Sequence, residues 1–220
     1  TLLLVTANRS VEKIGDGVRV YAHIFYDDKY LEVHTRRNKL EAKDVGNQNP
    51  PIKDYFESLF KKVENYFVNQ SINIKVEVKD VSENKNLSFH TGVFLDRRKT
   101  LENLEEYGKT LRKSSSTIFY LFTWSEYPFP EPFRTTSKFY GMSDRETKAT
   151  FCTKNVSAAL IRHYHGSLTF WTAVKATATI FGSDHFASFS PTDRKTMKEL
   201  FMHCPTGDAM AEATSEIPSC

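Results

Sequence analysis

Hydrophobic and polar positions recur along the first half of the chain with the periods of strands and helices. Residues 18–26 are rich in β-branched and aromatic side chains, which is typical of a strand. Residues 52–67 place apolar side chains at intervals of three and four, which predicts an amphipathic helix. In residues 72–81 apolar and polar side chains almost alternate, as in a half-buried strand. The order strand, helix, strand favours an α/β crossover.

The middle of the chain predicts a second helix and the centre of the sheet. Apolar side chains keep helical spacing over residues 99–111, and a run of serines follows. Residues 117–124 form a continuous apolar run, which suits a central strand covered on both faces. Two short extended pieces, residues 138–142 and 158–163, fit a hairpin or a pair of edge strands.

A last helix is predicted after these pieces. Ser167 can act as its N-cap, and the helix should run to Phe181. Gly182 follows at the position where a left-handed turn ends many helices. Just before the helix, His163 and His165 are two residues apart on a predicted strand, and we interpret them as surface histidines rather than as a metal-binding pair.

Composition places the chain among folded globular proteins. Of its 220 residues 40% are hydrophobic and 13% aromatic, which argues against disorder and low complexity. Thirty basic residues stand against 27 acidic ones, a balance too even to indicate nucleic-acid binding. There is no run of about 18 apolar residues, so the sequence predicts no membrane span.

The cysteines and glycosylation sequons favour the secretory pathway. The chain has three cysteines and no C-x-x-C pair, which suggests one local disulfide and one remaining thiol rather than a zinc knuckle. The short apolar N-terminus is too short for a signal-peptide core, so we expect a processed chain. Four N-x-[ST] sequons predict a secreted glycoprotein. The sequon residues are Asn8, Asn69, Asn86 and Asn155.

The end of the last predicted helix carries the most informative pattern. In a metzincin zinc protease the same stretch reads H-E-x-x-H-x-x-G-x-x-H, in which the three histidines bind zinc and the glutamate is the general base. Gly182 and His185 stand at the expected glycine and third-histidine positions. The positions of the first histidine, the glutamate and the second histidine hold Lys175, Ala176 and Thr179.

Further motifs occur in the metzincin order around this passage. Phe139-Tyr140-Gly141-Met142 precedes Cys152, the strand-like residues 157–163 follow, and Cys204-Pro205 comes before a G-x-x-M motif that ends at Met210. On these motifs the chain, over roughly residues 18–220, resembles the reprolysin (adamalysin) branch of the metzincins. Within this branch it resembles in particular the small secreted metalloproteases of tick saliva.

The resemblance implies the fold class and the domain organisation. It implies an α/β (α+β) fold with a mixed, mostly parallel twisted sheet, long helices, a degenerate active-site helix and a Met-turn at Met210. Residues 1–220 should then form a single catalytic-type domain. Residues 1–17 would be an N-terminal extension, and residues 183–220 a small C-terminal subdomain that contains the Met-turn.

The departures from the family pattern remove its chemistry. A catalytic zinc needs three protein ligands, and the resemblance leaves only His185. The Lys175 ammonium would repel Zn²⁺, and Ala176 lacks the carboxylate that activates water. We therefore predict a pseudoprotease with no metal, no other cofactor and no catalytic residues. Either the charge of Lys175 or apolar packing by Ile180, Phe181 and Phe186 should then replace the metal as the stabilising element.

The resemblance also implies a disulfide pairing. In the family, the cysteine before the Met-turn can pair with a cysteine after it, which favours Cys204 with Cys220. This closed loop of about 16 residues would contribute about 3 kcal/mol in the chain-entropy model. Cys152 would then be free and could link two molecules. Pairing of Cys152 with Cys220 is the alternative.

The function expected from the resemblance is binding. We expect a secreted, non-catalytic protein that engages an unidentified host protein and disturbs haemostasis, complement or immune signalling, with no nucleic-acid partner. One alternative is an altered metallohydrolase that uses Asp184, His185 and Glu212. Another is a small-molecule carrier that uses the vacated active-site cleft.

Overall fold

A five-stranded sheet forms the centre of the protein. The computed structural model describes residues 11–31, 51–91, 94–124 and 145–205. The strand order is β2-β1-β5-β7-β6, and β6 alone runs antiparallel to its neighbour. These strands are β1 (Arg19–Tyr26), β2 (Lys75–Glu83), β5 (Thr117–Thr123), β6 (Arg145–Glu146) and β7 (Ser157–Arg162). A small hairpin of β3 (His90–Thr91) and β4 (Phe94–Leu95) lies outside this sheet.

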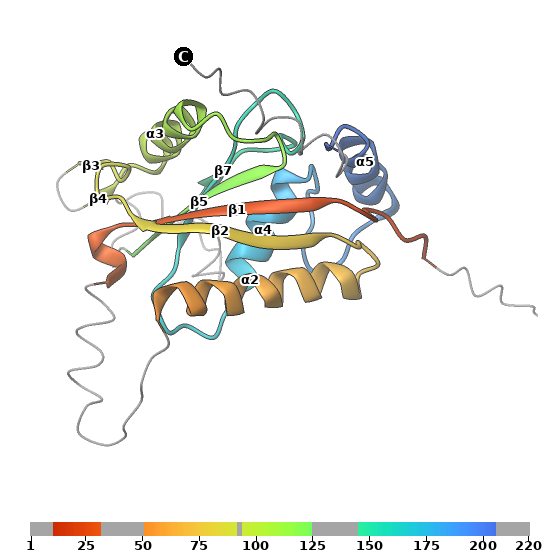
Figure 1. The fold of residues 1–220 in the computed structure, drawn as a ribbon, viewed down its shortest axis with the longest axis horizontal. Coiled ribbons are helices and arrows are strands. Elements are labelled where there is room, and N and C mark those ends of the chain that lie inside the picture. The colour runs from red at the N-terminus through yellow and green to blue at the C-terminus, as the bar shows by residue number, and fades with distance from the viewer. Residues whose placement is uncertain (1–10, 32–50, 92–93, 125–144, 206–220) are drawn as a thin grey trace, which may run out of the picture.

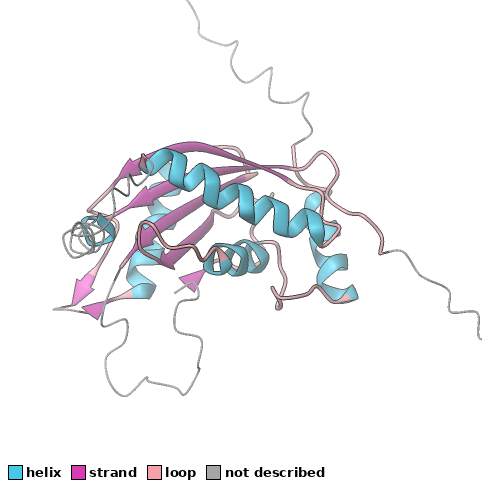
Figure 2. Ribbon diagram, turned by 90° about the horizontal axis from the view of Figure 1, so that it is seen from below, coloured by secondary structure: helices cyan, strands magenta, loops and turns pink. Residues whose placement is uncertain are grey.

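Helices cover both faces of the sheet. Two helices, α2 and α4, pack against one face, and α3 packs against the other (Figures 1 and 2). The helices are α2 (Ile52–Asn69), α3 (Arg97–Thr110), α4 (Trp171–Ile180) and α5 (Pro191–Phe201). The predicted fold class, a mixed α/β protein with a mostly parallel sheet, is confirmed. None of the described helices is long and apolar enough to cross a membrane.

The hydrophobic pattern predicted the central elements correctly. All residues of β5 are buried, as the apolar run of residues 117–124 requires of a strand with helices on both faces. β1 pairs in parallel with β2, and α2 connects them, so the predicted crossover is confirmed. The helix α3 begins two residues before the predicted start, because the Asp96 side chain accepts a hydrogen bond from the Lys99 amide and caps it.

The edge strand β2 contains a bulge, and the spacing of the valines in its sequence reflects it. The pairing runs from Ala22 opposite Val78 to His23 opposite Asp80, so Lys79 is an extra residue in β2. The core-facing valines are accordingly two residues apart before the bulge and three apart across it. The strand also begins at Lys75 rather than at residue 72.

The last predicted helix starts later than the sequence suggests. α4 begins at Trp171 and has no side-chain cap, so the prediction of Ser167 as its N-cap is wrong. The residues before α4 are tied to other elements instead: Tyr55 donates to the Ser167 carbonyl at 3.0 Å, and His163 Nε2 lies 3.0 Å from the Thr169 carbonyl. These bonds hold the segment away from helical geometry.

The end of α4 agrees with the glycine signal. Gly182 has a φ of +87°, in the left-handed region that a glycine adopts without steric cost. A Cβ atom at this position would lie 2.7 Å from Thr196 Cγ2 on α5. Gly182 therefore permits both the turn after α4 and the close approach of α5.

The helix α5 was not predicted. It begins with a capping box in which the Ser190 side chain accepts from the Asp193 amide and the Asp193 carboxylate accepts from the Ser190 amide. Met197 and Phe201 are buried in the main core, which lies between the sheet and the helices α2 and α4. Ile14 near the N-terminus is buried in the same core. The described parts of the predicted extension and C-terminal subdomain therefore share one core with the rest of the domain.

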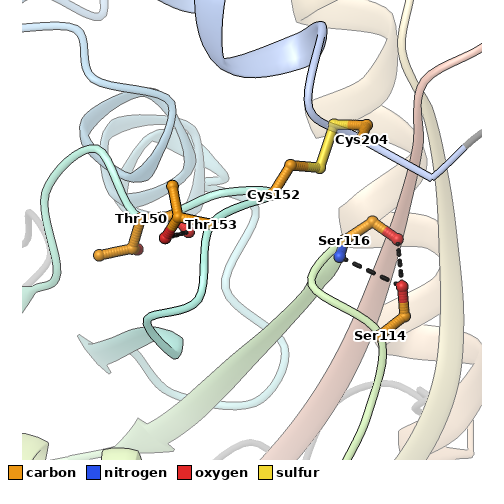
Figure 3. The surroundings of a disulfide bond; sticks show 6 residues. All are labelled: Ser114, Ser116, Thr150, Cys152, Thr153 and Cys204. Carbon is orange, nitrogen blue, oxygen red and sulfur yellow. Dashed lines mark hydrogen bonds between the residues drawn. A yellow bond between two sulfur atoms is a disulfide. The ribbon is translucent and has the colours of Figure 1, made fainter.

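The disulfide differs from the predicted pairing. Cys152 and Cys204 are bonded, with a Cα–Cα distance of 4.8 Å (Figure 3). The pairing of Cys204 with Cys220, the alternative of Cys152 with Cys220, and a free Cys152 thiol that links two molecules are therefore wrong. The reason is tertiary: Phe151 packs against Phe181 and Phe201, and this packing brings Cys152 to the end of α5.

Candidate functional site

The α4 residues that the resemblance aligns with the zinc motif lie on two different sides of the helix. Lys175 and Thr179, one helical turn apart, are half-buried on the same side, as two metal-binding histidines would be. Ala176, at the position of the general base, has no exposed surface and belongs to the main core. A longer side chain at this position would point into packed apolar groups.

Lys175 forms an ion pair with the antiparallel edge strand. Its Nζ lies 3.5 Å from Glu146 Oε1 of β6, and the two side chains are 31% and 9% exposed. The contact joins α4 to β6 at a position where a zinc ligand would stand in the family. Because the Glu146 carboxylate is largely removed from water, a nearby positive charge offsets part of its desolvation cost.

Backbone bonds tie the segment after β6 to the end of α4. The Ala149 amide donates to the Thr179 carbonyl at 3.1 Å, and the Thr150 amide donates to the Ile180 carbonyl at 3.1 Å. Carbonyls in the last turn of a helix have no partner within the helix, so these amides satisfy them. Lys148 adds an ion pair with Asp184 in the loop after α4. The edge of the sheet and α4 are therefore held together by several direct contacts.

His185 is held by a carboxylate of α5. Its Nδ1 lies 2.9 Å from Asp193 Oδ2, while its side chain is 64% exposed. Asp193 also accepts bonds from the Ser190 amide, the Ser190 hydroxyl and the Asp184 amide. Burial alone would raise the pKa of Asp193, but hydrogen bonds from Ser190, Ser183 and Asp184 hold it well below its usual range. The carboxylate therefore fixes both the turn after Gly182 and the start of α5.

These residues do not fit a catalytic zinc. The three α4 positions that the resemblance aligns with the motif offer an ammonium, a methyl group and a hydroxyl that donates a hydrogen bond to the Lys175 carbonyl at 3.1 Å. No group of three or more His, Cys, Asp or Glu side chains suited to a metal occurs among the residues that the structure describes. Sequence reasoning missed Glu146, for which no local signal exists, and Asp193, which the Ser190-Pro191-x-Asp193 pattern could have revealed as a capping residue.

The alternative hydrolase residues have separate partners. Asp184 pairs with Lys148, whereas His185 pairs with Asp193. Glu212 lies outside the described residues, and so do Met210 of the predicted Met-turn, Cys220, Asn8 and the extended piece 138–142. The other sequon residues, Asn69, Asn86 and Asn155, are exposed.

His163 and His165 are buried, so the prediction of surface histidines is wrong. Their exposed fractions are 2% and 6%, and their rings pack against Tyr30 and Tyr55 with centroid distances from 4.6 to 6.3 Å. This cluster lies beyond the carboxyl end of β7. Burial lowers the pKa of His163 to about 4, although its bond to the Thr169 carbonyl opposes the shift.

The buried His163 predicts an acid-sensitive stability. The unfolded chain takes up a proton at this histidine near pH 6.5, whereas the folded protein does so only near pH 4. The unfolded state therefore gains stability as the pH falls through this window, and the folded protein should lose about 3 kcal/mol of stability. Urea unfolding of the parent and of His163→Gln, measured at several pH values, checks this.

The His163→Gln variant separates the contribution of this histidine to the pH dependence of stability from that of the carboxylates, which titrate in the same pH range. His163→Gln should show less loss of stability between about pH 6.5 and pH 4. His203→Gln, which changes an exposed histidine on the same chain, should keep the parent profile. An unchanged profile for His163→Gln would show that another group carries the acid sensitivity.

Comparisons with known proteins show a distant structural likeness. No protein-family model matches the amino-acid sequence, and no curated protein is similar to it. Among solved structures, the chain is similar to metalloproteinase-II from Bacteroides fragilis, with a TM-score of 0.46 and 11% sequence identity. The similarity covers 86% of this chain and 54% of that one, so the chain spans about half the length of its neighbour. The comparisons assign no family and no activity to the chain.

Proposed function

We propose that this protein is a non-catalytic relative of the reprolysin-type metalloproteases, a pseudoprotease that acts by binding. The observation that carries the proposal is the pairing of Lys175 with Glu146 at 3.5 Å. An ammonium that is bound to a carboxylate cannot serve as a zinc ligand, and it repels a cation. The buried Ala176 beside it supplies no general base.

The structural role of the metal is taken by other contacts in this proposal. In the family, zinc ties the active-site helix to the turn that carries the third histidine. Here Asp193 binds His185 and the Asp184 amide, and the Cys152–Cys204 disulfide fastens the neighbouring segment to the end of α5. The turn is thus held by groups of the chain itself.

We further propose that the protein is secreted and glycosylated. An intramolecular disulfide persists in oxidising compartments, which is the environment of secreted proteins. Three described sequon residues are exposed, so a glycosyltransferase could reach them without disturbing the core. The biological setting follows from the resemblance to salivary metalloproteases: a host protein of haemostasis, complement or immune signalling is the proposed partner.

Two measurements separate a binding protein from an enzyme. We expect purified protein dialysed against zinc to retain far less than stoichiometric metal by mass spectrometry. We also expect no chelator-sensitive cleavage of casein or fibrinogen. Stoichiometric zinc, or cleavage that a chelator abolishes, would overturn the pseudoprotease proposal.

The partner is sought by affinity capture from host plasma. The immobilised native protein should retain a discrete plasma protein, which titration with the purified partner then confirms. The same protein, reduced and alkylated so that the Cys152–Cys204 bond is lost, is the matched control. Retention of the same proteins by both forms, or of none by the native form, would count against the binding function.

A further inference from the structure

A cavity lies on the sheet face opposite the degenerate helix. On this face α3 packs mainly over β7, with fewer contacts to β5 and β6, and leaves β1 and the edge strand β2 partly uncovered. The cavity lies over these uncovered strands. Its volume is about 470 Å³, which is in the range of small-molecule sites. Its apolar wall includes Tyr21 and Phe25 of β1 and Tyr107 of α3.

The bulge in β2 gives this cavity its charged side. In a regular strand, successive side chains point to opposite faces. Because Lys79 is inserted between the residues that pair with Ala22 and His23, both Lys79 and Asp80 line the cavity. Bulges often re-aim side chains at functional sites.

His23 is a buried polar group that lines the same cavity. It is 8% exposed, and its ring contacts Phe119 at a centroid distance of 5.6 Å. Within the described part of the chain its ring nitrogens make no hydrogen bond. Burial lowers the pKa of His23, and the charges of Lys113 and Lys79 lower it further, while Asp80 opposes them. The neutral ring presents one N–H donor and one acceptor at the cavity.

Lys113 gives the cavity a cationic group that has no carboxylate partner among the described residues. Lys79 and Lys113 line it against the single carboxylate of Asp80. Lys79 lies 4.7 Å from the centre of the Tyr21 ring and is bonded to Glu77. Lys113 is exposed, in the connection between α3 and β5. The arrangement combines cationic groups and a histidine donor with aromatic walls.

We propose that this cavity binds a small organic anion with an aromatic body. The anionic group would be received by Lys113 and the His23 N–H, and the rings of Tyr21, Phe25 and Tyr107 would cover the body. The site is separate from the positions that replace the zinc motif, since it lies across the sheet from α4. It goes beyond the proposed function and does not depend on it.

A pair of fluorescent dyes that differ in one charged group tests the site. Anilinonaphthalene sulfonate is an aromatic monoanion, and phenylnaphthylamine has the same ring system without the sulfonate. The anionic dye should bind with one-to-one stoichiometry and at least about fivefold more tightly than the neutral dye, as expected for one partly exposed charge interaction. Equal affinities for the two dyes would overturn the anion preference.

Variants locate the bound dye. Lys113→Met keeps an unbranched side chain and should weaken the binding of the anionic dye by about fivefold, with no change in the binding of the neutral dye. His23→Phe keeps a ring in place and should also weaken the binding of the anionic dye. Lys62→Met removes an exposed charge from α2, on the other face of the sheet, and should change neither affinity. If the anionic dye binds Lys113→Met and His23→Phe as it binds the parent, the dye occupies another surface and the proposal fails.

Discussion

Ala176→Glu should lower the free energy of unfolding by about 3 kcal/mol or more, although it introduces the residue that a zinc protease needs. The position has no exposed surface and lies in the core that α4 shares with the sheet and α2. A glutamate would both overfill this core and bury an ionisable group without a partner. Thermal unfolding followed by circular dichroism should show a melting temperature lower by roughly 6 °C or more.

A matched substitution on the same helix separates burial from helix propensity. Thr179→Gln places a side chain of similar length on the half-buried side of α4, where it can reach water. It should cost about 1 kcal/mol or less. If Ala176→Glu were as stable as Thr179→Gln, position 176 would not be sealed by the core.

Loss of the Cys152–Cys204 bond should cost about 4 kcal/mol in the chain-entropy model, because the bond closes a loop with a sequence separation of 52. Cys152 also has a φ of +55°, a conformation that is uncommon for residues other than glycine. Urea unfolding of the parent and of a Cys152→Ser/Cys204→Ser double variant, measured by tryptophan fluorescence, gives the difference.

Cys220→Ser distinguishes this pairing from the one that the family resemblance implies. Because Cys220 has no part in the Cys152–Cys204 bond, the variant should unfold at the same urea concentration as the parent. Peptide mapping under non-reducing conditions should recover Cys152 and Cys204 in one linked fragment. A destabilised Cys220→Ser variant, or a fragment that links Cys204 to Cys220, would show that the C-terminal pairing forms.

In our proposal, three sets of contacts keep α4 in its place. On its buried side, Ala176 and its neighbours are packed into the core. On its half-buried side, Lys175 is paired with Glu146. At its end, the Asp193 carboxylate accepts a hydrogen bond from the Asp184 amide, and amides of the segment after β6 donate to the last carbonyls of α4. A helix held by these contacts needs no metal to stay in position.

The sequence by itself determined the order and type of most elements. The three-and-four spacing of residues 52–67 became α2, the unbroken apolar run became the buried β5, and Gly182 ended α4 in a left-handed turn. These features depend on local periodicity and backbone preference, which neighbouring residues alone set.

Only the tertiary structure decided which groups meet. Glu146 lies against Lys175, Cys152 meets Cys204, and His163 is buried beneath Tyr30 and Tyr55. Each of these contacts joins elements far apart in the chain, and their partners depend on how the sheet, its helices and the loops pack. Side-chain type and spacing could suggest a charge, a thiol or a ring at each position. The neighbour that each one finds is set by the packing of the whole domain.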